Sequence, residues 1–170
     1  MRMIRLCLAG CVAILLQAAL AQAGLPGYLL PQLALLVVVQ AAFLEHGVQG
    51  VAASFLIGLA LDFSSALLVG PWAGAFVAVY AGLTIVSRGL FVDSALVTVL
   101  AAFLSSVAAG VFFSVLSPNS DLSALGHILH IISQAAVTAA CAPLFLPCIA
   151  YVSERRSGAI GRVSAAAPAL

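Results

Sequence analysis

One carboxylate, Asp62, stands inside an otherwise apolar stretch that runs from Gly58 to Gly74 and reads GLALDFSSALLVGPWAG. Only 6% of the 170 residues are Asp, Glu, Lys or Arg. An ionisable side chain in apolar surroundings is costly, and within a membrane it often marks a functional site. Two interpretations of Asp62 are therefore open from the residues alone: an acid with a functional role, or a side chain that caps a turn at the end of a helix.

Other groups that could do chemistry are few. His127 and His130 are three residues apart, and a zinc site there would need Asp121 as a third ligand. Cys7 and Cys11 are four residues apart, but they lie in an apolar run, which favours small buried hydrophobic side chains. The sequence holds no zinc-protease motif, no Gly-rich phosphate loop and no evident Ser-His-Asp set. We expect no metal, no cofactor and no enzymatic activity.

The composition indicates an all-α integral membrane protein. The chain is 65% hydrophobic, with a mean hydropathy of +1.27, whereas a soluble domain is about half apolar and about a quarter charged. Its few charged residues would not cover the surface of a water-soluble domain of this length. A net charge of +1 with no lysine offers no basic surface for nucleic acid.

Glycine, proline and charged residues divide the chain into six apolar segments. We expect membrane-spanning helices at residues 6–23, 29–44, 48–63, 72–87, 90–116 and 122–152. A span needs about 20 apolar residues, or fewer where neighbouring helices cover its ends. The spans form one domain, 1–153, followed by a short disordered cytoplasmic tail at 154–170.

The arginines predict the orientation of this bundle. With the N-terminus in the cytoplasm, six spans place every arginine on the cytoplasmic side, as the positive-inside rule requires. These arginines are Arg2, Arg5, Arg88, Arg155, Arg156 and Arg162. The first segment also resembles a secretory signal that ends at Ala21-Gln22-Ala23, so residues 1–23 are either a retained span or a cleaved leader.

Small residues recur every four positions in the third and fourth segments, so each set lies on one helix face. Small side chains let membrane helices approach closely, and we expect these two faces to pack together. The set in the third segment is Gly50, Ser54, Gly58 and Asp62, and the set in the fourth is Gly70, Gly74, Ala78 and Gly82. Buried amides such as Gln17, Gln32, Gln40 and Gln134 are expected to form hydrogen bonds between helices.

The stretch from Pro31 to Tyr80 resembles the MreD family of bacterial rod-shape-determining membrane proteins. That family shows a proline opening the second span, a G-x-x-x-D element, a small polar residue and a later glycine. The matching residues here are Pro31, Gly58, Asp62, Ser65 and Gly70. The chain departs from the family pattern at Gln32, where an acid is usual, and at Ala66, where a glycine is usual.

The resemblance implies a six-span fold like that of the substrate-binding components of energy-coupling-factor transporters. It also implies a bacterial inner-membrane scaffold of the elongation complex, which supports cell shape and lateral peptidoglycan synthesis. The implied partners are a single-span MreC-like protein and, through the complex, RodA, a penicillin-binding transpeptidase and MreB. The alternative is a substrate-binding subunit of a vitamin-type transporter, whose pocket would draw on Asp62, Trp72, Asn119, His127 and His130.

Overall fold

The computed structural model describes residues 2–44, 47–65, 70–87, 95–116 and 124–154. Within these residues the fold is all-helical, with six α-helices and one short 3₁₀ helix. The elements are α1 (Arg2–Gln22), η1 (Gly27–Leu29), α2 (Leu33–Leu44), α3 (Val48–Ser65), α4 (Pro71–Ser87), α5 (Ala95–Leu116) and α6 (Ala124–Glu154). Several residues of the sequence predictions lie outside the described part: Ala66, Arg88, Asn119, Asp121 and 155–170 of the expected tail.

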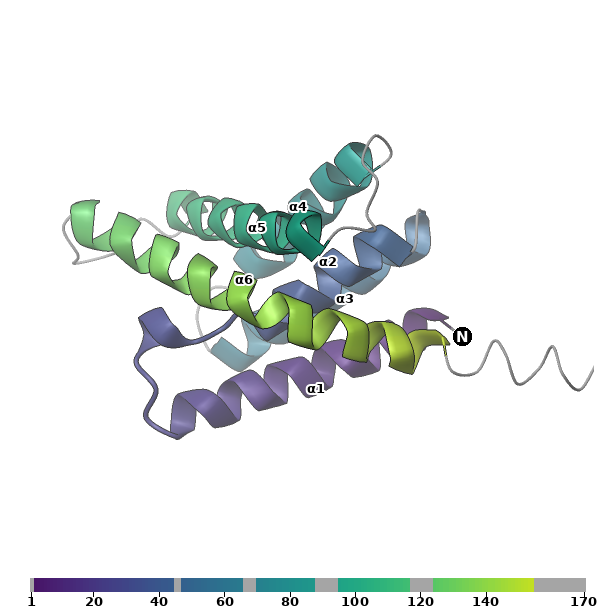
Figure 1. Ribbon diagram of the computed structural model, residues 1–170, viewed down its shortest axis with the longest axis horizontal. Helices are drawn as coiled ribbons and strands as arrows, with labels where there is room; N and C mark the ends of the chain where they lie inside the picture. The colour runs from purple at the N-terminus through teal and green to yellow at the C-terminus, as the bar shows by residue number, and fades with distance from the viewer. Residues whose placement is uncertain (1, 45–46, 66–69, 88–94, 117–123, 155–170) are drawn as a thin grey trace, which may run out of the picture.

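Helix α2 is the centre of the bundle. Every side chain from 33 to 39 is at most 1% exposed, and α2 contacts α1, α3, α4, α5 and α6. A helix that is apolar all round, as α2 is, can bury every face. Consecutive helices run in alternating directions, so the start of α1 and the end of α6 lie at the same end of the bundle (Figure 1).

The outer faces of the described helices carry many large apolar side chains. Leucines on the outer faces of α1, α5 and α6, such as Leu15, Leu96 and Leu144, are 69–80% exposed. Three described helices contain segments long and apolar enough to cross a membrane: Met3–Gln22 in α1, Leu96–Val115 in α5 and Leu125–Leu146 in α6. The apolar helices α2, α3 and α4 are shorter. An exterior of this kind is suited to lipid and not to water.

The second helix begins later than the predicted segment 29–44. Leu30 is extended, with φ −81° and ψ 114°, and α2 begins at Leu33. The reason is Pro31, because a proline disfavours the helical conformation of the residue before it. Residues 27–29 form the separate helix η1, which packs against α6.

Helix α1 is built into the core. Leu6, Ala13 and Ile14 are at most 8% exposed, and a Cβ at Gly10 would lie 2.8 Å from Cδ1 of Ile57 in α3. We therefore predict that α1 is retained as a span, because its removal would expose the faces of α2 and α3 that it covers. The intact mass of the purified protein checks this, and a mass that lacks residues 1–23 would contradict it.

Candidate functional site

Asp62 caps the first turn of α4 from the last turn of α3. Its side chain is 1% exposed. Oδ2 accepts hydrogen bonds from the backbone N–H groups of Gly70 at 2.9 Å and Ala73 at 3.1 Å, and Oδ1 accepts one from Trp72 at 3.1 Å. The first N–H groups of a helix have no partner inside the helix and form its positive end. The Asp62 carboxylate supplies both the missing acceptors and the opposite charge.

The Gly70-Pro71 pair completes this cap. Gly70 has φ +123°, a conformation that residues with a Cβ rarely adopt, and its carbonyl accepts the N–H of Gly74 at 2.9 Å. Pro71 is the first residue of α4, where its missing N–H leaves nothing unsatisfied. Every backbone N–H from 70 to 74 is thus paired, and Asp62 accepts three of them.

A serine of the same corner pairs with its own helix. The Ser64 hydroxyl donates to the carbonyl of Leu61, three residues earlier in α3, at 2.8 Å. Ser65 ends α3, and its side chain lies outside the described part of the structure. The polar groups described at this corner therefore close helix ends.

Gly58 brings the backbones of α3 and α4 together one turn before Asp62. A Cβ on Gly58 would lie 2.6 Å from Cα of Ala73 and 2.7 Å from the carbonyl oxygen of Trp72. Both neighbours are backbone atoms, so neither can move aside by a change of rotamer. The absence of a side chain at Gly58 is what lets the carboxylate of Asp62 reach the first turn of α4.

Tyr80 holds the opposite end of the α3–α4 interface. Its hydroxyl accepts the N–H of Gly47 at 3.3 Å and donates to the carbonyl of Gly47 at 3.2 Å, just before α3 begins. A Cβ at Gly50 would collide with this hydroxyl. The Ser54 hydroxyl is buried and donates to the Gly50 carbonyl at 2.8 Å. The four small or polar positions predicted along α3 therefore all face inward.

The expectation that the small face of α4 packs against that of α3 is wrong beyond Gly70. A Cβ on Gly74 would meet the ring of Phe112 in α5 at 3.2 Å, and one on Gly82 would meet nothing within 4 Å. Ala78 is exposed. Helix α4 instead presents Ala73 and Tyr80, seven residues apart, to α3. Residues 74, 78 and 82 lie about 110°, 150° and 170° around the helix from that face, since an α-helix has 3.6 residues per turn.

Gln32, at the start of α2, joins three helices. Its Nε2 donates to Oε1 of Gln134 in α6 at 3.1 Å, and its Oε1 accepts the hydroxyl of Ser106 in α5 at 3.1 Å. Its backbone N–H donates to Oγ1 of Thr138 at 3.0 Å. Gln32 is 5% exposed, and Pro31 beside it is also buried. This confirms the predicted bond between buried amides for Gln32 and Gln134.

We predict that Gln32→Leu lowers the free energy of unfolding by about 1–3 kcal/mol, because it leaves the half-buried amide of Gln134 and the buried hydroxyl of Ser106 without this partner. Gln40→Leu is the matched control, since Gln40 is buried in the same helix and has no hydrogen bond to the described residues. Thermal unfolding in detergent measures both variants. Equal losses would contradict a special role for Gln32.

The two histidines point to different neighbours. Nε2 of His127 pairs with the hydroxyl of Ser114, which itself donates to the carbonyl of Gly110 at 2.7 Å. The ring of His130 lies beside Gly27 of η1. Within the described residues, no three His, Cys, Asp or Glu side chains gather as metal ligands.

Cys7 is partly buried, whereas Cys11 is exposed on the outer face of α1, so the prediction of a buried side chain is wrong for Cys11.

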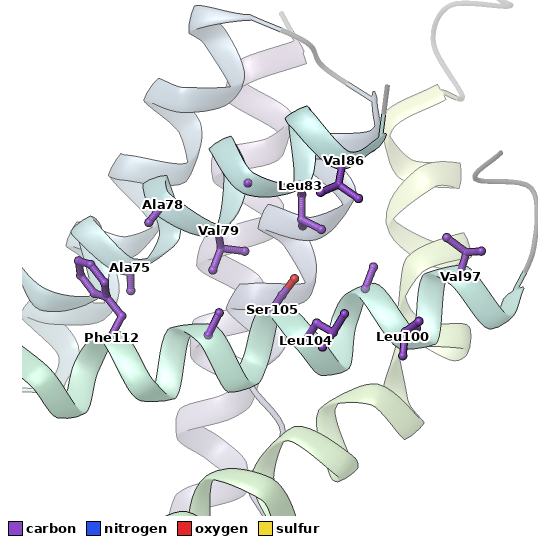
Figure 2. A pocket seen from close by; sticks show the side chains of 13 residues that line it. Ala75, Ala78, Val79, Leu83, Val86, Val97, Leu100, Leu104, Ser105 and Phe112 are labelled. Carbon is purple, nitrogen blue, oxygen red and sulfur yellow. The ribbon is translucent and has the colours of Figure 1, made fainter. Parts of the chain in front are cut away.

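A groove of about 360 Å³ lies between α4 and α5 (Figure 2). It closes where Phe112 meets Gly74 and opens towards Gly82. Its α4 side is lined by Ala75, Ala78, Val79, Gly82, Leu83 and Val86, and its α5 side by Val97, Leu100, Ala101, Leu104, Ser105, Ala108 and Phe112. The sequence predicted the small residues on α4 but not this groove, because spacing alone does not say which neighbour a face meets.

The fold and these contacts define a class. The described chain is an all-helical protein with an apolar exterior, consistent with a membrane protein, whose buried Asp62 and Gln32 join its helices. Comparisons with protein-family models, with curated proteins and with solved structures found no match.

Proposed function

We propose that this protein is a non-enzymatic scaffold of the bacterial inner membrane that supports cell shape and lateral peptidoglycan synthesis in the manner of MreD. In this proposal all six helices are embedded in the membrane, the short helices being covered by their longer neighbours. Both termini are cytoplasmic, as the arginine distribution favours. The fold class is that of the substrate-binding components of energy-coupling-factor transporters.

The observation that carries the proposal is that the buried polar side chains form hydrogen bonds between helices. Asp62 is the residue that one would first examine for chemistry, and Gln32 is a buried amide. Both are engaged in hydrogen bonds with other helices. Asp62 and Gly58, two residues that carry the resemblance to MreD, together form the corner between α3 and α4. A bundle braced in this way offers fixed outer faces for recognition of another membrane helix.

The alternative, a vitamin-type substrate-binding subunit, needs polar groups that converge on a ligand. Both carboxylate oxygens of Asp62 are occupied by backbone N–H groups, and Nε2 of His127 is paired with Ser114. These contacts favour the scaffold. The groove between α4 and α5 has Ser105 as its one polar side chain among the described lining residues.

The test is co-purification combined with cell shape. A tagged copy expressed in its bacterial host is expected to recover a single-span MreC-like protein, and deletion of the gene is expected to turn rods into round cells. Normal rods after deletion, together with no recovery of an MreC-like protein, would overturn the proposal. Saturable binding of a vitamin by the purified protein would favour the transporter alternative.

A further inference from the structure

The groove between α4 and α5 has the length and the apolar lining of a helix-binding site. On α5 its lining runs from Val97 to Phe112, and on α4 it runs from Ala75 to Val86. At about 1.5 Å per residue these walls are about 22 Å and 16 Å long, or three to four helical turns. The lining includes Gly82, Ala101 and Ala108, whose small size permits the close backbone approach on which helix association in lipid depends.

The rim of the groove is apolar and reaches outwards. Leu100 and Leu104 are 58% and 57% exposed, and both line the groove from α5. Val86 is 54% exposed and lines it from α4. The described lining carries no charge, so an occupant must be uncharged along this length. We therefore expect the groove and its occupant to lie at the depth of the membrane interior and not in water.

Ser105 distinguishes between possible occupants. Its side chain is 4% exposed and lines the groove, and Figure 2 shows its hydroxyl pointing from α5 towards α4. Among the described residues this hydroxyl has no hydrogen-bond partner, in contrast to the hydroxyl of the adjacent Ser106. An acyl chain offers no group that could bond to it. A transmembrane helix does, through a Ser, Thr, Asn or Gln side chain or through a carbonyl exposed at a small residue.

We infer that the groove between α4 and α5 binds the single transmembrane helix of the scaffold's partner, and that this helix forms a hydrogen bond with Ser105. The inference rests on the proposed function, since it names the face through which the scaffold holds its partner. The partner helix carries small residues on the face that enters the groove and one hydrogen-bonding residue at the depth of Ser105.

Filling the groove tests the inference in the complete protein. Gly82→Leu adds a side chain where nothing lies within 4 Å, so the fold should tolerate it while the groove is blocked. Ala81→Leu is the matched control, because Ala81 is exposed on the same helix and does not line the groove. With a tagged MreC-like partner co-expressed, we expect Gly82→Leu to reduce recovery at least about tenfold, a loss of 1.4 kcal/mol, and Ala81→Leu to leave it unchanged.

The outcomes separate the two claims. No recovery by the wild-type protein would overturn the proposed function and the inference together. Recovery by the wild type that persists in Gly82→Leu, with the thermal unfolding midpoint unchanged, would overturn the inference alone.

A photo-crosslinking residue in the groove identifies the occupant directly. Placed at Leu104, which lines the groove, it should form an adduct with the partner. Placed at Leu129 of α6, which is 58% exposed and outside the groove, it should not. An adduct at Leu104 with a second copy of the chain would overturn the inference in favour of self-association. An adduct with lipid only, while the partner is still recovered, would overturn it in favour of an acyl chain.

Discussion

Asp62→Ala is expected to lower the free energy of unfolding by about 3 kcal/mol, because three backbone N–H groups at the start of α4 lose their acceptor at once. One of these groups, the N–H of Ala73, is buried in an apolar bundle where water cannot replace the carboxylate. The variant also loses the negative charge at the positive end of α4. Asp62→Asn should cost about half as much, since one amide oxygen can still accept the bonds from Gly70 and Ala73.

Trp72 makes this prediction easy to measure. It is the only tryptophan in the chain and stacks on Phe113 with ring centroids 4.7 Å apart, so its fluorescence reports on the corner that Asp62 holds. Thermal unfolding in detergent should give midpoints in the order wild type, Asp62→Asn, Asp62→Ala. Ser64→Ala, a few residues away on an exposed surface, is the control. A midpoint for Asp62→Ala equal to that of the wild type would contradict the capping role.

The same variants bear on the partner. Because Asp62 is 1% exposed, its carboxylate is not available to a partner's juxtamembrane segment in this structure. We therefore expect recovery of the partner by Asp62→Asn to follow the amount of folded protein and no more. Loss of the partner at an unchanged folded fraction would contradict this and would indicate that Asp62 takes part in partner binding.

Much of the α3–α4 corner could be predicted from the sequence. An aspartate that continues a row of small residues, followed by serines and a Gly-Pro pair, indicates a buried helix end and a turn. The donors could not be predicted, because every residue except proline has a backbone N–H group. Only the close approach at Gly58 selects those of Gly70, Trp72 and Ala73.

The spacing of small residues in α4 did not predict which helices these residues contact. A row of glycine and alanine marks a face without bulk, but it does not identify what comes near that face. Along α4 the neighbours differ at each turn: backbone N–H pairing at Gly70, the ring of Phe112 at Gly74 and open space at Gly82. The partner of Gln32, in contrast, could be predicted. Gln134 was one of the few amides in the sequence, and a buried amide in an apolar bundle has few other groups with which it can form a hydrogen bond.

Gly58→Ala is expected to have the second large effect, although it adds a single methyl group. Its Cβ would lie within 2.6–2.8 Å of three backbone atoms of Trp72 and Ala73, so α4 must shift as a unit or the helices must separate. Overpacking of this kind costs about 1–3 kcal/mol, and we expect the upper end because no side chain can rotate away. The shift would also pull the first turn of α4 away from Asp62.

Gly82→Ala is the matched control for this substitution, because it makes the same chemical change in the neighbouring helix. Nothing lies within 4 Å of the added methyl group there, and alanine favours the helix over glycine by about 0.5–1 kcal/mol. We therefore expect opposite signs: a lower unfolding midpoint for Gly58→Ala and an equal or higher one for Gly82→Ala. Combining Gly58→Ala with Asp62→Ala should cost less than the sum of the two, since both act on the same first turn of α4. Additive losses would mean that Gly58 and Asp62 hold α4 independently, which the shared contacts with Trp72 and Ala73 argue against.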